Sequence, residues 1–157
     1  MSVQCQAMNQ NNRRCRNKTA QVYPYCWIHL KSLDKLQIKQ SRIQGAGKGL
    51  FYVGKTPVPP DRTITQYSSE RITREGNPNS DYVLQISRNQ FLDSDNKLNY
   101  AGRYINDSRN GQNNVRFGNG YNIREVNNRF VVPVRTTRRI LPNTELLTSY
   151  GRRYWDN

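Results

Sequence analysis

The chain has few apolar residues, few acidic residues and very little cysteine or histidine. Hydrophobic residues make up 34% of its 157 positions, and no stretch approaches the roughly 18 uninterrupted apolar residues of a membrane helix. The N-terminal residues MSVQCQAMNQ lack the apolar run of a signal peptide. These absences exclude a membrane partner and predict an intracellular protein. The low apolar content also predicts a thin core that a metal or a partner would help to stabilise.

Acidic residues are scarce relative to basic ones. There are 25 Lys and Arg residues against 11 Asp and Glu, so the net charge is +14. The charge is uneven: residues 1–40 and residues 101–157 each carry +6, whereas residues 41–100 carry +2. Such a protein is unsuited to a polycationic partner and favours polyanions, or proteins that carry them.

All three cysteines and the single histidine lie within 25 residues, at Cys5, Cys15, Cys26 and His29. Their spacing, C-x9-C-x10-C-x2-H, supplies the four sulfur or nitrogen ligands that a closed structural zinc site needs. An odd number of cysteines without a signal peptide argues against a disulfide framework. The alternative is a set of unrelated buried thiols and a surface histidine. That alternative does not explain why residues 30–157 contain no Cys or His.

We therefore predict that residues 1–30 form a small zinc module, followed by a linker at residues 31–37. The pattern also resembles short Cys3His modules that occur as appendages of other proteins. A segment of this size needs a metal to fold, which favours a structural role for the zinc. The second interpretation is an anion-binding finger that uses Arg13, Arg14, Arg16 and Lys18.

The rest of the chain contains short segments typical of strands and no long helical period. Residues 29–36 (HLKSLDKL) favour a short amphipathic helical turn. The segments that favour strands are residues 36–39, 50–53, 63–67, 82–86 and 129–134. Turn-rich stretches separate them, so the sequence predicts a mainly β fold.

Four further segments occur in a specific order. Residues 41–51 read SRIQGAGKGLF, residues 64–70 read ITQYSSE, residues 100–108 read YAGRYINDS and residues 145–151 read ELLTSYG. Together they resemble the motifs of SET-domain protein lysine methyltransferases, over about residues 36–155. The resemblance predicts a SET domain at residues 38–157, without the cysteine-rich post-SET segment of many relatives.

The resemblance implies a fold of small β-sheets around a pseudoknot, in which the segment near Asn106 threads under the chain near Tyr150. It also implies a reaction, the transfer of a methyl group from S-adenosylmethionine to a lysine Nε. Tyr150 and Tyr82 match the catalytic tyrosine and a tyrosine of the lysine channel. The residues that the resemblance assigns to the cofactor are Gly47, Lys48, Gly49, Arg103, Asn106, Asp107, Tyr150 and Trp155.

The chain departs from the family pattern at several positions. Asp107 stands where a histidine is usual, and Ser149 where an aspartate is usual. These departures keep a second hypothesis open: a basic, zinc-containing protein that binds nucleic acid and has an inactive SET-like domain. Thr148 occupies the position that limits the number of methyl groups in relatives, and it favours no particular number.

The substrates implied by the resemblance are histone tails or nucleosomes, which predicts a nuclear or host-nuclear location. The two basic ends would then dock on nucleosomal DNA while the near-neutral middle grips the tail. Non-histone substrates, such as ribosomal or host proteins, are a third interpretation. The sequence leaves open whether the protein forms a homodimer and what closes the lysine channel.

Overall fold

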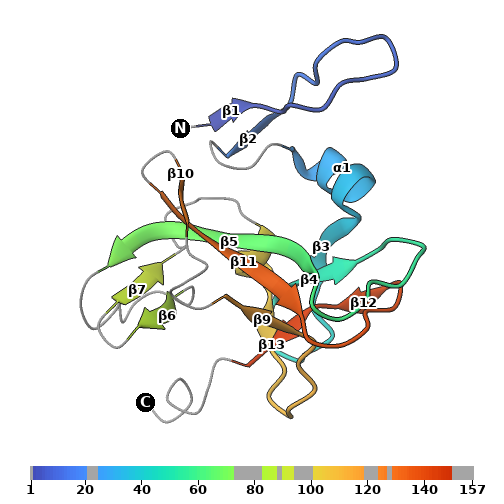
Figure 1. Ribbon diagram of the computed structural model, residues 1–157. Coiled ribbons are helices and arrows are strands. Elements are labelled where there is room, and N and C mark those ends of the chain that lie inside the picture. The colour runs from blue at the N-terminus through green and yellow to red at the C-terminus, as the bar shows by residue number, and fades with distance from the viewer. Residues whose placement is uncertain are drawn as a thin grey trace.

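The computed structural model describes residues 2–20, 25–72, 83–87, 90–93, 101–118, 124–126 and 129–149. Within these ranges the chain consists mainly of short strands, with three short helical turns. The strands form four small sheets (Figure 1). The predicted mainly β fold is therefore confirmed. None of the helical turns in the described ranges is long and apolar enough to cross a bilayer.

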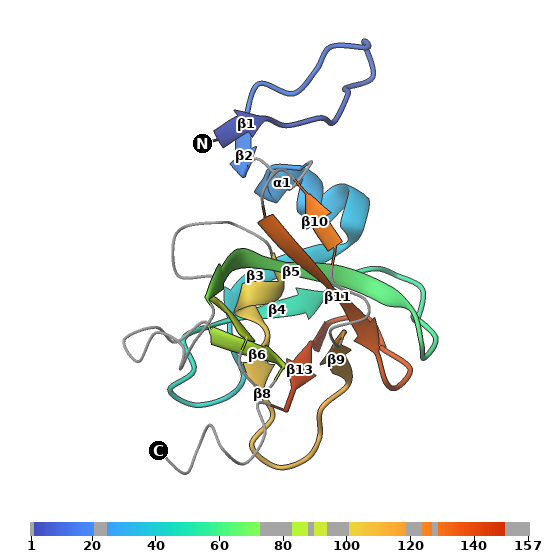
Figure 2. The same cartoon turned by 60° about the vertical axis from the view of Figure 1, so that its left-hand side comes forward.

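The N-terminal segment is a hairpin that stands apart from the larger sheets in both views (Figures 1 and 2). Strand β1 (Ser2–Gln4) pairs antiparallel with β2 (Lys18–Ala20). The long connection between them narrows at an antiparallel bridge between Met8 and Arg14. Its tip is closed by the Asn9 side chain, whose Oδ1 accepts hydrogen bonds from the backbone N–H groups of Asn11 and Arg13.

Helical turns join this hairpin to the sheets. Helix α1 (Trp27–His29) continues into the π-helical turn η1 (Leu30–Asp34), which confirms the helical turn expected here. Lys35 ends it in the left-handed conformation, with φ 59°, and its N–H donates to the Leu30 carbonyl. Strand β3 starts at the next residue.

The largest sheet has the strand order β10-β11-β5-β7-β6, and β9 also pairs with β11. Its strands are β5 (Thr63–Ile72), β6 (Val83–Ser87), β7 (Gln90–Asp93), β9 (Val115–Phe117), β10 (Arg124–Val126) and β11 (Arg129–Thr136). All of these pairings are antiparallel. The strands predicted at 63–67 and 129–134 are confirmed. The strand predicted at 82–86 appears as β6, except that Tyr82 lies outside the described residues.

A second, three-stranded sheet has the order β12-β4-β3. It contains β3 (Leu36–Gln40), β4 (Lys48–Tyr52) and β12 (Thr144–Glu145), so the predicted strands at 36–39 and 50–53 are confirmed to within two residues. The antiparallel pairing places Glu145 opposite Phe51. A segment close to the C-terminal end of the chain therefore lies beside the strand that follows the glycine-rich loop.

The fourth sheet is parallel and crosses the chain over itself. After the 3-10 turn η2 (Ala101–Tyr104), strand β8 (Asn106–Asp107) pairs with β13 (Leu147–Thr148). On its other side β13 is bound by Asn114, whose N–H donates to the Leu147 carbonyl while its Oδ1 accepts from the Leu147 N–H. Residues 145–148 thus run between the two limbs of the loop 106–114, which is the pseudoknot expected from the resemblance.

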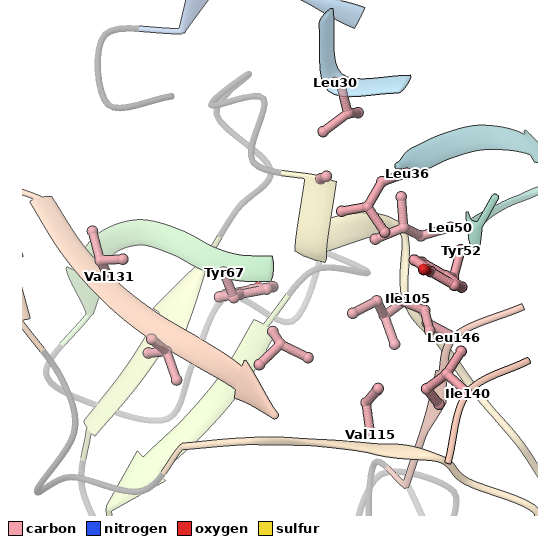
Figure 3. Packing of buried hydrophobic residues seen from close by; sticks show 13 residues of the cluster. Leu30, Leu36, Leu50, Tyr52, Tyr67, Ile105, Val115, Val131, Ile140 and Leu146 are labelled. Carbon is pink, nitrogen blue, oxygen red and sulfur yellow. The ribbon is translucent and has the colours of Figure 1, made fainter. Parts of the chain in front are cut away.

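Among the described residues, thirteen buried side chains form the main hydrophobic core (Figure 3); most of them come from η1, η2, β3, β4, β5, β9 and β11. Strand β11 is buried on both faces, since the adjacent Val131 and Val132 are both inaccessible to solvent. Leu30 of η1 enters the same core and is only 4% exposed, close to Leu36 (Figure 3). The helical turns are therefore fixed to the sheets by packing.

Candidate active site and metal centre

The four predicted metal ligands lie together in the N-terminal segment. The ligand atoms of Cys5, Cys15, Cys26 and His29 all lie within 4.8 Å of one another. His29 Nδ1 is 3.3 Å from Cys26 Sγ and 3.6 Å from Cys5 Sγ, and Cys15 Sγ is 4.0 Å from Cys26 Sγ. A zinc tetrahedron with ordinary bond lengths has edges of about 3.5 Å between nitrogen and sulfur and about 3.8 Å between sulfurs. The spacing of the donors therefore fits a tetrahedral metal ion.

Local structure brings these ligands together. One turn of helix separates Cys26 from His29, and the Leu30 N–H donates to the Cys26 carbonyl at 2.7 Å. Cys5 is anchored by the hydrogen bond from its N–H to the Asn17 carbonyl, and Cys15 by the bond from its N–H to the Ala7 carbonyl. The two arms of the hairpin thus carry one cysteine each to the start of the helix.

The surroundings of Cys26 favour a thiolate. Burial raises the pKa of its thiol, but hydrogen bonds from the His29 and Ile28 backbone, the Asn17 amide and the His29 side chain lower it to about 6. Asn17 Nδ2 lies 3.5 Å from Cys26 Sγ, and the backbone N–H of Cys26 donates to Cys5 Sγ at 3.3 Å. Thiolates are the form in which cysteine binds zinc. All three cysteines are free thiols, which agrees with metal binding better than with disulfides.

The second group of predicted site residues surrounds the glycine-rich loop. The Ser41 N–H donates to the Gly47 carbonyl at 2.8 Å, which closes residues 41–47 into a tight turn. Gly45 and Gly47 have φ values of 77° and 69°, which residues with a side chain rarely adopt. Gly47 and Lys48 are exposed, so the loop leaves backbone groups open to a ligand.

Gly49 is restricted for a different reason. A Cβ atom at this position would overlap the carboxylate of Glu145, which is only 4% exposed. Glu145 Oε1 accepts from the Ser41 hydroxyl at 2.6 Å, and Oε2 from the Arg42 N–H at 2.9 Å. The buried carboxylate therefore holds the start of the glycine-rich loop by hydrogen bonds and packs closely against Gly49 at its end.

Asn106 joins this network from the pseudoknot. Its Nδ2 donates to the Lys48 carbonyl at 2.9 Å and lies 3.4 Å from Glu145 Oε1. The structure thus brings Asn106 beside Gly47, Lys48 and Gly49, although Asn106 lies 58 positions after Lys48 in the sequence. Asn106 is partly exposed, so it faces both the buried carboxylate and the surface.

Two more predicted cofactor residues flank Asn106. Asp107 is 6% exposed and its Oδ1 accepts from the Arg109 N–H at 2.6 Å, while Arg109 has φ 61°. The aspartate in place of the usual histidine therefore caps its own loop. Arg103 lies in η2, with its guanidinium 5.4 Å from the centre of the Tyr104 ring. It is half-buried, one turn before Asn106.

The two predicted catalytic tyrosines, Tyr82 and Tyr150, and the predicted cofactor residue Trp155 lie outside the described residues. Their nearest described neighbours are Val83 at the start of β6 and Ser149 after β13. The roles assigned to these three residues stay predictions.

The sequence interpretation gave little weight to Glu145 and Asn114. Glu145 bonds both the glycine loop and Asn106, and Asn114 holds Leu147 from one side while its Nδ2 donates to the Glu145 carbonyl at 2.9 Å. The available signal was chemical: an acidic residue and an asparagine inside the recognised motifs of a chain that has few acids. Their importance depends on contacts between residues more than thirty positions apart.

The profile of the SET domain family matches residues 7–151, which is most of the chain. The chain belongs to the SET domain family. No curated protein sequence matches it significantly.

Several solved structures share the fold of this chain. A candidate histone methyltransferase from Plasmodium falciparum is 22% identical, with a TM-score of 0.55, and the match covers 77% of this chain and 96% of that one. The polycomb repressive complex 2 of Chaetomium thermophilum matches 74% of this chain at 18% identity and a TM-score of 0.55. A stimulated, active polycomb repressive complex 2 matches the same share at 19% identity and a TM-score of 0.54. Each polycomb match spans only 15% of the chain concerned, and at these identities the likeness establishes the fold alone.

Proposed function

We propose that this SET protein is an S-adenosylmethionine-dependent protein-lysine N-methyltransferase. The observation that supports this most is the family match over residues 7–151, together with an Asn106 amide that holds the glycine-rich loop at Lys48. The loop turns at Gly45 and Gly47, where glycine accepts a positive φ, and it leaves Gly47 and Lys48 exposed to a ligand. The division into a zinc module at 1–30, a linker at 31–37 and a SET domain at 38–157 is part of the proposal.

The cofactor would lie against the glycine-rich loop. Gly47, Lys48 and Gly49 would contact it through their backbone, and Asn106 would present its amide oxygen, since Nδ2 already donates to Lys48. Arg103 in η2 and Asp107 in β8 would support the cofactor-binding residues from the adjacent turn and strand. Tyr150 and Trp155 would contribute from the C-terminal segment. S-adenosylmethionine supplies an electrophilic methyl group on a sulfonium centre.

The protein groups would mainly position the amine. A lysine has an ordinary pKa near 10.4 and must lose its proton before it can attack. A channel with apolar walls and a nearby positive charge favours the neutral amine. Tyr82 and Tyr150 would line the channel and orient the lysine nitrogen, so that alignment supplies most of the acceleration.

Histone tails, free or in nucleosomes, are the substrate class we propose. The support is the similarity of this chain to a candidate histone methyltransferase of Plasmodium falciparum and to polycomb repressive complex 2. The charge of +14 favours docking of the basic ends on DNA, with a nuclear or host-nuclear location. A homodimer is compatible with this proposal.

We also propose that Cys5, Cys15, Cys26 and His29 bind one structural Zn²⁺. The four donors leave no ligand position for a substrate, so the ion would have no catalytic role. Its function would be to fold the hairpin. Purified protein should contain about one zinc per chain by elemental analysis. A metal content near zero after expression with zinc would contradict the assignment.

The decisive experiment for the enzyme measures transfer of labelled methyl groups. The protein is incubated with labelled S-adenosylmethionine and, separately, nucleosomes, free histones and a ribosomal extract. Tyr150→Phe should abolish transfer. Tyr52→Phe, which removes a hydroxyl bonded to the Thr56 carbonyl away from this site, should not.

The outcomes distinguish the hypotheses. If the protein transfers no label and calorimetry detects no binding of the cofactor, the enzyme proposal fails. That result would favour the inactive, nucleic-acid-binding alternative. Label in ribosomal proteins alone would replace histones as the substrate. Equal activity on free histones and nucleosomes at low and moderate salt would remove the role of DNA docking.

A further inference from the structure

A pocket of about 220 Å³ lies where the N-terminal segment meets the sheets. It is lined by residues from three parts of the chain: β2, the segment around α1 and η1, and the sheet side with β3 and η2. The lining residues are Lys18, Thr19, Tyr25, Cys26, Trp27, Leu30, Ile38, Ala101 and Tyr104. None of the residues of the glycine-rich loop takes part, so the pocket is separate from the proposed cofactor site.

The walls of this pocket suit a flat aromatic ligand. Three aromatic side chains, Tyr25, Trp27 and Tyr104, contribute to them, and the aliphatic floor includes Leu30 and Ala101, which are 4% and 2% exposed. Small-molecule sites commonly combine apolar and aromatic walls with a few polar groups. The volume exceeds the roughly 150 Å³ of an engineered cavity that binds benzene, so a heterocyclic base fits.

The charge around the pocket selects an anionic ligand. Lys18 lines it directly and is exposed. On the same segment the side chains of Arg13, Arg14, Arg16 and Lys31 are also exposed, and the first acidic residue of the chain is Asp34. A methylated lysine, which aromatic cages otherwise attract, would be repelled by this surface. An aromatic group joined to phosphates would be attracted to it.

Trp27 gives the surface a second feature of nucleic-acid binding. Its side chain is 74% exposed, which is unusual for a large aromatic group, and it lines the pocket together with Lys18. Proteins that bind single strands combine a basic groove with aromatic side chains on which bases stack. A base inside a duplex is already stacked and paired, and cannot enter such a pocket without being extruded.

We propose that this pocket binds one unpaired base of a single-stranded nucleic acid. The base stacks on Trp27 between Tyr25 and Tyr104, and Lys18 contacts the adjoining phosphate. The exposed Arg13 and Arg16 of the same hairpin attract the rest of the strand by their charge. The site would therefore recognise single-stranded RNA or DNA, in addition to any contact of the basic ends with duplex DNA.

The test uses the zinc-bound full chain and fluorescein-labelled oligonucleotides. Fluorescence anisotropy compares oligouridylate and oligothymidylate of about twelve nucleotides with a duplex of the same length, between about 50 and 200 mM salt. Both single strands should bind more tightly than the duplex. Preference for one of them identifies RNA or DNA as the natural ligand class, and either result supports the pocket.

Matched variants separate stacking from charge. Trp27→Ala should weaken single-strand binding about tenfold. Leu141→Ala removes an apolar side chain that is 54% exposed but outside the pocket, and it should have no effect. Lys18→Gln should lower the salt dependence by about 0.7 in the slope of log K against log salt, relative to the exposed control Lys55→Gln.

A second measurement locates the base. An oligonucleotide that carries 5-iodouracil is cross-linked by light, and the attached residue is identified by mass spectrometry. Attachment to Tyr25, Trp27 or Tyr104 supports the proposal. Equal affinity for the duplex, attachment elsewhere, or a Trp27→Ala effect no larger than that of Leu141→Ala would overturn it. None of these readouts depends on methyl transfer, so this proposal and the proposed enzyme can fail separately.

Discussion

The N-terminal segment and the SET sheets are both built of short strands, yet they are stabilised in different ways. The sheets share a core of thirteen buried hydrophobic residues. In the part of the N-terminal segment that the structure describes, the buried cluster consists of Cys5, Ala7 and Cys26, and two of these are predicted metal ligands. An apolar core of this size cannot offset the chain entropy of a hairpin of that length. One region should therefore fold through packing and the other through its metal.

The contrast extends to the polar contacts. In the SET region a single buried carboxylate, Glu145, connects the glycine loop, β12 and the pseudoknot. In the N-terminal segment the corresponding centre is the group of four donor atoms, which lie within 4.8 Å of one another. Each region has one polar centre, but only the second would need an ion from outside the chain.

Removing the metal should have the largest effect on stability, and it should unfold the N-terminal segment without unfolding the SET sheets. Chelation, or Cys26→Ser, removes a binding free energy of roughly 10 kcal/mol that is coupled to folding of the module. We expect the amides of β1 and β2 to lose protection from hydrogen exchange, while those of β5 and β11 keep theirs. Adding zinc back to the chelated protein, but not to Cys26→Ser, should restore protection. If the hairpin amides kept their protection from hydrogen exchange without metal, the N-terminal segment would not depend on a metal for folding.

Gly49→Ala tests the centre of the SET region. The added Cβ would overlap the buried Glu145 carboxylate, so we expect a loss of about 4 kcal/mol in the free energy of unfolding. Denaturant titration measures this loss.

Gly45→Ala is the matched control, because an added Cβ there meets nothing within 4 Å and only the positive φ is unfavourable. That change should cost about 1 kcal/mol. Equal effects of the two substitutions would show that Glu145 does not hold the loop as described.

The sequence predicted well those features that depend on local spacing. The Cys-x-x-His pair lies on one helical turn, and the strands around residues 36–39, 50–53, 63–67 and 129–134 follow from alternating or short apolar segments. The resemblance supplied the crossing of the chain near Asn106, which no local pattern contains. Local propensity cannot specify which distant strand lies alongside another.

The features that sequence interpretation missed depend on contacts between distant segments. Glu145 could be recognised as part of a motif, but not as the partner of Ser41, Arg42 and Asn106. Leu30 follows the last metal ligand and was assigned to the module boundary, whereas its side chain lies in the SET core. The pocket beside Trp27 exists only because three segments meet, so composition alone indicated the charge and not the site.

Leu30→Ala tests whether the helical turn after His29 is stabilised by the hydrophobic core of the sheets or by the metal site. Truncating this buried side chain should lower the free energy of unfolding of the sheets by about 3 kcal/mol, without loss of zinc. Thermal unfolding and elemental analysis on the same sample measure both. Leu33→Ala, at a position that is 50% exposed on the same helical turn, should change stability by less than about 0.5 kcal/mol. Loss of zinc from Leu30→Ala alone would mean that the helical turn belongs with the metal site.

Asn106→Ala should lower stability less than Gly49→Ala or Leu30→Ala does, and it should have a clear effect on cofactor binding. The substitution leaves the Lys48 carbonyl without its amide donor and removes a neighbour of the buried Glu145 carboxylate. The expected cost is about 2 kcal/mol in stability. Because the glycine-rich loop would no longer be held against the pseudoknot, binding of S-adenosylmethionine should weaken about tenfold by calorimetry.

Two further variants separate loop positioning from a general loss of stability. Asn110→Ala, in an exposed turn where Oδ1 accepts only the Gln112 N–H, should change neither stability nor cofactor affinity. Asn106→Asp keeps the shape but replaces a donor with a second carboxylate beside Glu145, so it should weaken binding more than Asn106→Ala does. If Asn106→Asp bound the cofactor as well as the original protein, the amide donor to Lys48 would be dispensable. The SET region would then depend on Glu145 and the packed core alone.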